Sequence, residues 1–486
     1  MKSQRYLKDL QKIVSGQILV EKEVLRYYSV DASSYQVLPR MVVIPKNEKD
    51  VSNTVKFGRR MNLSVTVRGA GTGLVGSALN NGIIIDLREF NSIRIEKNTA
   101  TVGTGASKGE LDKKLNEKGK FFPPNPSVGL FCSIGGMIGN NSSGSHSLKY
   151  GSMIDNVKEI TLINGEGKKI TLPKNKTIGK KIVAISKCIE LEKYPKTSKN
   201  SSGYRLDKIK SFKDSHKVLV GSEGTLGIIL SAKIKIMNIP KRRILYVIGY
   251  PSLNKAASNC QDILSSNPSA IEFVDKSTLM QFPPKFNKST KCVLLVEYDS
   301  EIKNKFMLTK IFTGNIIKIT SDDSEIKKWW RYRDSSLYYS LKSINSKERL
   351  PHIIEDAAVP VEKLEKLFML IHKINTKFHT KSIAYGHAGN GNIHIRLIAN
   401  REKTDYLNDI ATLYFNEIIR MNGTITGEHG DGLARSEFVS KLYGQKNYAL
   451  FKQLKKIFDP YEILNPGKII NKGSKMLKNL EKMPNV

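Results

Sequence analysis

Two glycine-flanked motifs in the second half of the chain contain three of its eight histidines. The first is YGHAGNGNIHI, with His387 and His394, and the second is TGEHGDGLARSEF, with Glu428 and His429. Glycines permit a tight turn that folds His387 back beside His394. Two imidazoles and a carboxylate with open positions suit a divalent ion such as Zn²⁺, Mn²⁺ or Fe²⁺. The alternative is two unrelated histidines in a strand turn and an ion-paired glutamate.

Three glycine-rich segments occupy the first half of the chain. RGAGTGLVG (68–76) follows the alternating run SVTVRG, and its glycines let a phosphate approach backbone N–H groups. Alone, this segment is equally a tight turn, and it lacks the spacing of the Rossmann fingerprint. PPNPSVGLFCSIGGMIGNNSSGSHSLKYG (123–151) is a long polar run that an extended polar ligand would order. GSEGTLGII (221–229) is the third segment.

In this order, the three segments resemble the flavin-binding domain of the vanillyl-alcohol oxidase/p-cresol methylhydroxylase family. The matching stretches are 45–76, 135–157 and GSEGTLGI. The resemblance implies FAD, and we expect it to be noncovalent because His146 is not placed as the family's covalent histidine. The implied cofactor contacts are Arg68, Gly69, Ala70, Gly71, Thr72, Gly73, Ser133, Gly136, Asn140, Ser143, Gly144, Glu223, Gly227, Ile228 and Asn465.

The two histidine motifs resemble the substrate domain of the D-lactate, glycolate and D-2-hydroxyglutarate dehydrogenase group. This resemblance implies that His387, His394 and Glu428 hold a divalent metal and that His429 accepts the substrate's hydroxyl proton. The family usually has Asp where this chain has Asn390. Because the ligating residues are retained, we expect this difference to adjust the properties of the metal site and not to abolish it.

A carboxylate substrate also requires a fixed cation. The spacing W-x-x-R at Trp330–Arg333 resembles the family's substrate-arginine motif, and a guanidinium binds carboxylate through two hydrogen bonds. The alternative is a surface arginine beside a packed tryptophan pair. In IIEDAAVP (353–360), Ile354 stands where several diacid-specific members have lysine. This difference favours a monocarboxylate such as D-lactate or glycolate.

The resemblance therefore implies an FAD-dependent dehydrogenase that oxidises a D-2-hydroxy acid to the 2-keto acid by hydride transfer to flavin N5. The alternatives are a D-2-hydroxyglutarate dehydrogenase, a non-redox enzyme like alkylglycerone-phosphate synthase, and a non-catalytic flavin subunit of a larger oxidase. A nucleic-acid binder is prompted by charge alone. Because a flavin subunit would lack the metal and base residues, His387, His394, Glu428 and His429 argue against that reading.

The elements that must position these residues indicate an α+β fold. GIIIDL (82–87) is a buried-strand run, and ILYVIGY and CVLLVEY are strands beyond Pro240. FDPYEILNPGKII resembles the family's C-terminal signature, where the chain returns to the flavin domain. The predicted organisation is a two-subdomain PCMH-type FAD-binding domain (1–239), an α+β substrate or cap domain with an antiparallel sheet (240–430), a returning segment (431–470) and a basic tail (471–486).

Composition is that of a globular protein, with 40% hydrophobic and 26% charged residues in 486. The formal net charge is +34, and the basic residues are spread along the chain as on ordinary solvated faces. Such a surface would also steer an acidic electron acceptor or rest on anionic lipid. We therefore expect a cytoplasmic protein with peripheral contact to the inner face of a membrane as an option, and no nucleic acid.

The four cysteines are Cys132, Cys188, Cys260 and Cys292, and none forms a CxxC pair. This spacing argues against a thiolate zinc site or a self-contained iron–sulfur cluster, and isolated cysteines suit a reducing compartment. The electron acceptor is then external: an iron–sulfur protein, an electron-transfer flavoprotein, a cytochrome, a quinone or oxygen. The stretch NNSSGSHSLKYG resembles family members that are fused to iron–sulfur modules, and this resemblance implies a separate iron–sulfur protein as the partner. No apolar run is long enough to span a membrane, and no secretory signal is expected at the N-terminus.

Overall fold

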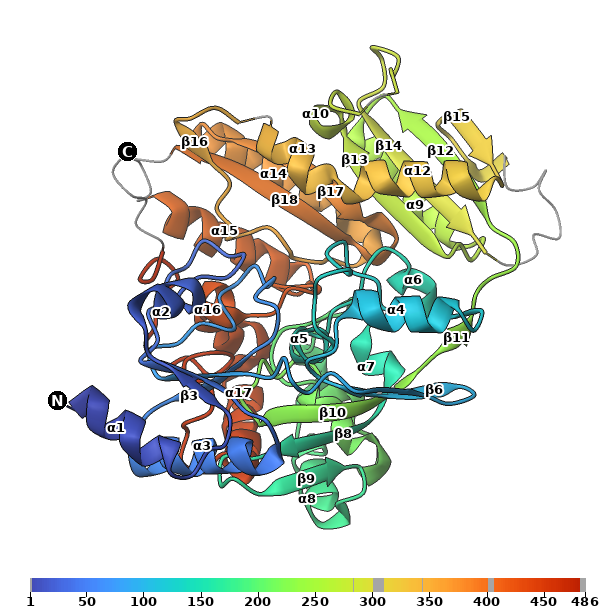
Figure 1. Ribbon diagram of the computed structural model, residues 1–486. Coiled ribbons are helices and arrows are strands. Elements are labelled where there is room, and N and C mark those ends of the chain that lie inside the picture. Colours follow the sequence, from blue (N-terminus) through green and yellow to red (C-terminus); the bar gives the residue numbers. More distant parts are fainter. Residues whose placement is uncertain (1, 283, 300–309, 343, 401–405, 481–486) are drawn as a thin grey trace.

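The computed structural model describes residues 2–282, 284–299, 310–342, 344–400 and 406–480. It has two lobes, which Figure 1 shows stacked one above the other. The lower lobe contains the first half of the chain and the C-terminal helices, and the upper lobe contains the residues between them. The prediction of an α+β fold is confirmed, because both lobes combine sheets with packed helices.

The first sheet of the lower lobe carries the first glycine loop. Strands β2 (Met41–Ile44) and β4 (Ile83–Asp86) are fully buried runs, and β4 pairs in parallel with both β2 and β3 (Val65–Arg68), as expected for strands covered on both faces. Strand β3 ends at Arg68, where the loop begins. The helices beside it are α1 (Lys2–Gln11), α2 (Lys22–Tyr28) and α3 (Glu48–Arg60). The sheet order is β1 (Gln17–Leu19), β2 (Met41–Ile44), β4 (Ile83–Asp86), β3 (Val65–Arg68).

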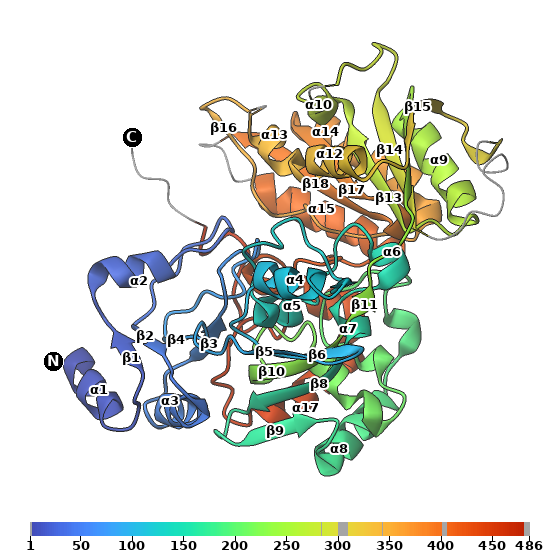
Figure 2. The same cartoon turned by 45° about the vertical axis from the view of Figure 1, so that its right-hand side comes forward.

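The second sheet of the lower lobe is antiparallel and lies beside the first (Figure 2). Its order is β5 (Ile93–Ile95), β6 (Thr99–Gly103), β10 (Ile228–Lys235), β8 (Val157–Ile163), β9 (Lys169–Leu172). The associated helices are α4 (Lys108–Asn116), α5 (Ile134–Asn140), α6 (Ser147–Tyr150), α7 (Met153–Asn156) and α8 (Lys176–Ser186). The short strands β7 (Lys120–Phe121) and β11 (Met237–Asn238) pair with each other just before the chain enters the upper lobe. Helix α5 therefore places the second glycine-rich segment above this sheet (Figure 2).

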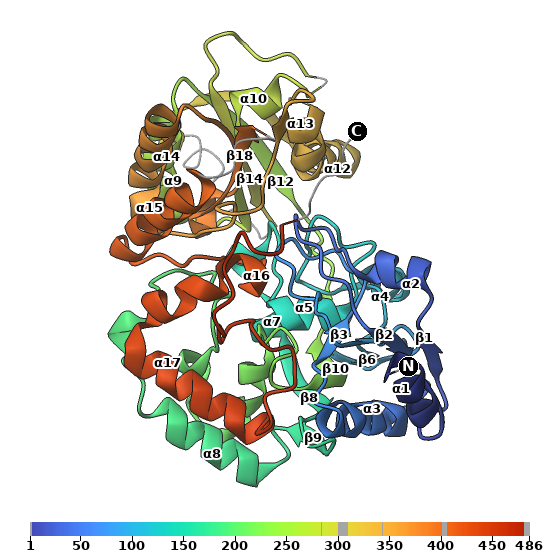
Figure 3. The ribbon, with the colours of Figure 1, turned by 90° about the vertical axis from the view of Figure 1, so that its left-hand side faces the viewer.

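The upper lobe is built on one seven-stranded sheet, and its described pairings are antiparallel, as predicted for the cap. The strand order is β15 (Asn315–Thr320), β12 (Ile244–Tyr250), β14 (Cys292–Tyr298), β13 (Ala270–Asp275), β17 (Lys381–His387), β18 (Asn392–Asn400), β16 (Glu348–Arg349). Figure 3 shows α9 (Leu253–Leu264), α14 (Leu364–Phe378) and α15 (Tyr406–Arg420) on one side of the sheet. Helices α10 (Lys276–Leu279), α12 (Asp323–Asp334) and α13 (Ser336–Lys342) lie on the other side (Figure 3).

After the upper lobe the chain returns to the lower one through α16 (Gly432–Arg435) and α17 (Val439–Phe458). The backbone N–H of Val65 in β3 then donates to the carbonyl oxygen of Ile463. In the segment expected as a basic tail, Met476 is buried and Leu480 forms a β-bridge with Tyr35. Residues 481–486 lie outside the described ranges. Among the described residues, none of the helices has the length and apolarity that crossing a bilayer requires.

The turn between β17 and β18 positions the first histidine motif. Tyr385 pairs with His394 and His387 pairs with Asn392, so their side chains share one face of the sheet. The turn closes through Gly391, whose φ of +67° lies in the left-handed region. A Cβ atom there would collide with the carbonyl oxygen of Val359. Both the backbone conformation and the close approach therefore require glycine at this position.

We predict that Gly391→Ala lowers the stability of the protein by about 3 kcal/mol or more, because backbone strain and a clash with a fixed carbonyl add together. The matched control is Gly119→Ala, since Gly119 also has a positive φ (+63°) but open space around its Cβ position. The control should lose only about 1 kcal/mol, from strain alone. Thermal unfolding monitored by circular dichroism measures both changes, and equal losses would show that packing against Val359 is unimportant.

Candidate functional site

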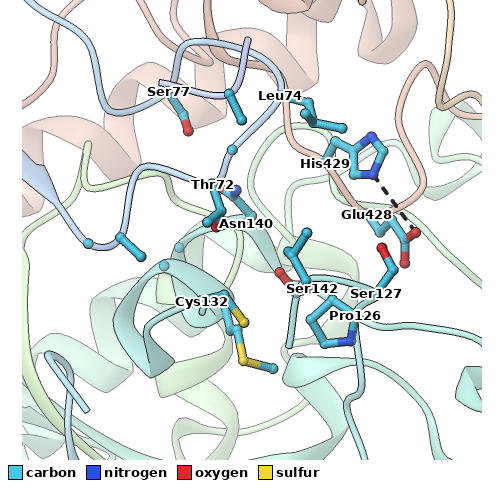
Figure 4. A pocket seen from close by; sticks show the side chains of 18 of the residues that line it. Thr72, Leu74, Ser77, Pro126, Ser127, Cys132, Asn140, Ser142, Glu428 and His429 are labelled. Carbon is cyan, nitrogen blue, oxygen red and sulfur yellow. Dashed lines mark ion pairs between the residues drawn. The ribbon is translucent and has the colours of Figure 1, made fainter. Parts of the chain in front are cut away.

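A cavity of about 420 Å³ is lined by residues from both lobes (Figure 4). Thr72 and Asn140 in its wall come from the lower lobe, and Glu428 and His429 come from the segment between the upper lobe and α16. Eighteen of the residues singled out from sequence line this cavity: Arg68, Gly69, Ala70, Gly71, Thr72, Gly73, Ser133, Gly136, Asn140, Ser143, Gly144, Glu223, Gly227, Arg333, His387, His394, Glu428 and His429.

Two predicted cofactor contacts lie outside this lining. Ile228 belongs to the hydrophobic core beneath the first sheet. Asn465 lies behind the cavity, where its Oδ1 accepts from the Thr66 hydroxyl (3.0 Å). Its Nδ2 donates to the carbonyl oxygens of Ser77 (2.8 Å) and Glu223 (2.7 Å). Asn465 therefore fastens the returning chain to two of the glycine-rich segments.

The first glycine loop packs closely against the second glycine-rich segment. A Cβ atom on Gly69 would collide with the Ser133 hydroxyl, and one on Gly71 would collide with the Arg68 guanidinium. Arg68 is buried under the loop and donates to the carbonyl oxygen of Val30 (2.7 Å). The loop consequently presents backbone, with little side-chain bulk, to the cavity, which suits an extended ligand carrying phosphate groups.

Glu223 organises the third glycine-rich segment. Its carboxylate accepts hydrogen bonds from the backbone N–H groups of Asp431 (2.6 Å) and Gly432 (2.9 Å). Burial and the nearby carboxyl group of Asp431 raise the pKa of Glu223 to about 8. The side chain thus ties GSEGTLGII to the segment that follows Glu428.

The two carboxylate oxygens of Glu428 have different surroundings. Oε2 accepts from the Ser143 hydroxyl (2.5 Å), the Gly144 N–H (3.1 Å) and the Lys199 ammonium (3.0 Å), all from the lower lobe. Lys199 is almost fully buried; burial lowers its pKa, and the charge of Glu428 opposes that shift. Oε2 is therefore fixed by the lower lobe.

Oε1 of Glu428 faces three imidazoles. It lies 2.9 Å from His387 Nε2, 3.3 Å from His394 Nε2 and 3.9 Å from His429 Nε2. The rings of His394 and His429 are stacked, and that of His387 is nearly perpendicular to His394. The structure therefore brings together the four residues that the two sequence motifs singled out.

Buried carboxylates orient two of these rings. His387 Nδ1 lies 2.7 Å from Glu272 Oε1, and His429 Nδ1 lies 2.8 Å from Glu355 Oε1. A carboxylate on Nδ1 fixes the tautomer that leaves Nε2 free to face the site, as in many metal centres. His394 Nδ1 has no hydrogen-bond partner among the described residues and lies 3.7 Å from Asp356 Oδ1.

Asp356 is a further member of the cluster. Ligand atoms of Asp356, His394, Glu428 and His429 lie within 4.8 Å of one another, a spacing that suits one metal ion. However, Asp356 Oδ2 already accepts from the backbone N–H groups of Glu428 (3.0 Å) and His429 (2.8 Å). We therefore regard Asp356 as the group that shapes the Glu428–His429 turn. The EDAAVP stretch contained this residue without indicating its contacts.

The protonation of the histidines differs. Burial and the nearby charges of His387 and His429 lower the pKa of His394 to about 4, although the hydrogen bond that His394 donates to Glu428 opposes the shift. Burial also acts to lower the pKa of His429, but Asp356 and Glu355 raise it to about 9. Among the protein's own groups, His394 is thus neutral at pH 7 and His429 is a cation. A further positive charge in the cluster would lower the pKa of His429 by repulsion.

Arg333 reaches the cavity from α12. It is buried, its Nε donates to Glu272 Oε2 (2.5 Å), and its Nη2 lies 3.4 Å from His387 Nδ1. The alternative of a surface arginine is therefore wrong. Trp330 of the same motif donates from Nε1 to Glu297 Oε2 (2.6 Å).

His146 does not belong to the cavity lining. Its Nε2 lies 3.0 Å from Glu297 Oε1, and its ring packs on Trp330 with a centroid distance of 4.8 Å. Asn390, the departure from the family's Asp, contacts two hydroxyl groups of the lower lobe. Its Oδ1 accepts from Ser147 (3.1 Å) and its Nδ2 donates to Ser198 (2.8 Å). These residues join the lobes beside the cavity.

Sequence reasoning missed several cavity residues. His352, Tyr385 and Arg396 all line it. A signal existed for Arg396, because the alternation of NIHIRLI places it on the same strand face as His394. Nothing in the sequence indicated Lys199 as the partner of Glu428.

Two family models match the chain. Residues 39–173 match the FAD binding domain, and residues 239–469 match the C-terminal domain of FAD linked oxidases. The glycolate oxidase subunit GlcD of Bacillus subtilis is 28% identical over 92% of this chain and 93% of its own length. A D-lactate dehydrogenase of Archaeoglobus fulgidus is 26% identical, with coverages of 92% and 96%.

Two further proteins are similar over most of this chain. A D-2-hydroxyglutarate dehydrogenase of Pseudomonas putida is 27% identical over 93% of this chain and half of its own length. Among solved structures, an alkyldihydroxyacetonephosphate synthase superposes with a TM-score of 0.67 over 95% of this chain and 84% of its own. At 18% identity, that likeness shows the fold alone.

We predict that Lys199→Met destabilises the protein by about 3–5 kcal/mol, because it leaves a buried carboxylate without its cation. The matched control is Lys108→Met. Lys108 is equally buried, but its partner Asp112 is partly exposed and can regain water, so the expected loss is about 1 kcal/mol. Denaturant unfolding measures both values. A loss for Lys199→Met no larger than that of the control would contradict the ion pair with Glu428.

Proposed function

Because this chain belongs to the FAD-linked oxidase family, we propose that it is an FAD-dependent dehydrogenase that oxidises a D-2-hydroxy acid to the 2-keto acid. Relatives along most of the chain are named for glycolate, D-lactate and D-2-hydroxyglutarate, which are all 2-hydroxy acids. The observation that carries the proposal is the position of Glu428. It joins the glycine-rich segments of the FAD-binding lobe to the imidazole cluster of the cap in one cavity.

The cavity fits FAD. Its wall follows the backbone of 68–73 and of 133–144, and Gly69 and Gly71 occupy positions where a Cβ atom would collide. When bound, FAD supplies at its N5 atom the acceptor for the hydride from C2 of the substrate. Noncovalent attachment is supported by His146, which is engaged with Glu297 and Trp330 outside the cavity lining.

The imidazole cluster fits a divalent metal ion. We propose His387, His394 and Glu428 as its ligands, because two Nε2 atoms and one carboxylate oxygen converge there. When bound there, a zinc, manganese or iron ion would supply a Lewis acid for the hydroxyl and carboxylate groups of a hydroxy acid. Its positive charge would also lower the pKa of His429.

The protein's own side chains then orient the substrate and move its proton. His429 accepts the hydroxyl proton at Nε2, and Glu355 at Nδ1 keeps the ring in place and stabilises the imidazolium that forms. Arg333 contributes positive charge on the His387 side of the cavity. The preference for D-lactate or glycolate stays a prediction, because Ile354 is a core residue outside the cavity lining.

We further propose that the electrons leave to an external acceptor, such as a separate iron–sulfur protein. The four cysteines have no spacing typical of cluster ligands, and the net charge of +34 would steer an acidic partner to the surface. A cytoplasmic protein with peripheral contact to an anionic membrane fits the same charge.

Anaerobic mixing with hydroxy acids tests the proposed function. We predict that D-lactate, glycolate or D-2-hydroxyglutarate bleaches the flavin absorbance at about 450 nm, and that L-lactate does not. In His429→Ala the same reduction should be about 10²–10⁴-fold slower, because the proton acceptor is missing.

A yellow protein that none of these acids bleaches would favour the non-redox alternative. A protein that stays colourless with added FAD would not bind the cofactor and would contradict the proposed function. Reduction of His429→Ala at the wild-type rate would exclude His429 as the base while leaving the reaction class intact.

We predict that the purified protein holds about one divalent ion per chain and that His394→Ala or Glu428→Gln removes it, because each variant deletes one of three ligands. Elemental analysis after dialysis measures the bound metal. The matched control is His372→Ala on the exposed face of α14, which should retain it. Equal metal content in all variants would exclude this ligand set.

A further inference from the structure

Arg396 is a buried cation in the cavity wall, and within the described part of the chain no carboxylate is hydrogen-bonded to it. We propose that Arg396 binds the carboxylate that every 2-hydroxy acid carries next to its hydroxyl carbon. This inference rests on the proposed function and names the residue that anchors its substrate. It moves the main anchoring role away from Arg333, to which the sequence motif pointed.

The strand places Arg396 beside the imidazole cluster. Arg396 and His394 are two residues apart on β18, so both side chains lie on the sheet face that also carries Tyr385 and His387. The Nε of Arg396 donates to the Tyr385 hydroxyl (3.1 Å), which fixes one edge of the guanidinium. Nη1, on the other edge, is buried and has no hydrogen-bond partner among the described residues.

The acid nearest to Arg396 has other partners. Glu355 Oε1 accepts from Arg435 Nη2 (2.8 Å) and lies 2.8 Å from His429 Nδ1. Glu355 Oε2 lies 3.5 Å from Arg396 Nη1, close enough for charge attraction but without a hydrogen bond. Asp356 is occupied by backbone N–H groups. Glu355 Oε1 and Asp356 Oδ2 therefore have hydrogen-bond donors other than Arg396, whereas Glu355 Oε2 accepts no hydrogen bond among the described residues and faces Arg396 Nη1 as its ion-pair partner.

Arg333 is in a different situation. Its Nε is bonded to Glu272 at 2.5 Å, and Asp334, which also lines the cavity, lies 3.9 Å from its Nη1. The two guanidinium carbons are nearly equidistant from the ring of Tyr385, at 5.8 and 5.9 Å. The cavity thus has two arginines around one tyrosine, and the charge of Arg396 is the less compensated.

His352, which also lines the cavity, supplies no second positive charge beside Arg396. His352 is neutral, because burial and then the positive charge of Arg396 lower its pKa to about 3. A buried guanidinium with an unsatisfied N–H gains most from a carboxylate, which accepts two parallel hydrogen bonds from it.

The position also matches the shape of a 2-hydroxy acid. Glu355 is the common neighbour of Arg396 and of His429, the proposed proton acceptor. One buried carboxylate therefore sets the spacing between the group that takes the hydroxyl proton and the group that holds the adjacent carboxylate. A substrate with these two functions on neighbouring carbons fits that arrangement.

The test compares wild type, Arg396→Met and Arg396→Lys as FAD-loaded proteins. Two readouts are used: the dissociation constant of oxalate from the shift of the flavin spectrum, and the substrate constant for flavin reduction by D-lactate, glycolate and D-2-hydroxyglutarate. We expect Arg396→Met to weaken both by about 10–100-fold, since a charge-assisted hydrogen bond is lost. Arg396→Lys should lie between, and Arg94→Met, on exposed β5, is the control.

A substrate analogue without the carboxylate distinguishes carboxylate binding by Arg396 from a merely structural role of this residue. Wild type should discriminate strongly between D-lactate and D-propane-1,2-diol, in which a hydroxymethyl group replaces the carboxylate, and Arg396→Met should lose most of that preference. General damage to the site would instead reduce the reaction with D-lactate and with D-propane-1,2-diol by the same factor. Flavin content and melting temperature identify a variant that fails to fold, in which case Arg396→Lys alone carries the comparison through its reduced oxalate affinity.

Wild-type oxalate affinity in a folded Arg396→Met protein would overturn the inference. So would a loss confined to D-2-hydroxyglutarate, because the arginine would then recognise a second acidic group. If no hydroxy acid reduces the flavin but oxalate binding still depends on Arg396, the anion site stands and the proposed function fails.

Discussion

The site depends on a single carboxylate, that of Glu428, being held between two lobes. One oxygen is immobilised by Ser143, Gly144 and Lys199 of the FAD-binding lobe. The other is presented to imidazoles carried by the sheet of the cap and by the turn after α15. A buried carboxylate is tolerated only when its charge is compensated and its lone pairs are bonded. Because groups from both lobes compensate the charge of Glu428 and bond its oxygens, this requirement fixes the position of one lobe relative to the other.

The other buried carboxylates are compensated in the same way. Glu272 is hydrogen-bonded to Arg333 and His387, and Glu355 is hydrogen-bonded to Arg435 and His429. Asp356 accepts hydrogen bonds from the backbone of the Glu428 turn. Carboxylates on Nδ1 turn the rings of His387 and His429 so that Nε2 faces the cavity. The chemistry proposed here takes place at these inward-facing Nε2 atoms. The Nδ1 atoms are paired with carboxylates that hold the rings in place.

Much of this arrangement was predictable because it depends on local requirements. The glycines of 68–73 and the polar segment 123–151 predicted the cavity wall, and the two histidine motifs predicted which residues meet there. Long-range partners were not predictable. Lys199 is 229 residues from Glu428, and a lysine in a polar segment carries no sign that it will be buried. Ile354 was compared with a lysine that diacid-specific family members have at this position, but the surrounding sequence did not reveal that Ile354 lies in the core and outside the cavity lining.

The chain leaves the FAD-binding lobe before β12 and re-enters it at α16, so the lobe is discontinuous. Asn465, which bonds Thr66, Ser77 and Glu223 together, belongs to the segment that is made after the cap. On the ribosome, Glu223 emerges 242 residues ahead of that partner, a delay of about 12–50 s at ordinary synthesis rates. The glycine-rich segments therefore lack their hydrogen bonds to Asn465 until the cap has been synthesised. The cofactor pocket is therefore completed only after the cap has been synthesised, when the cap is already available to close it.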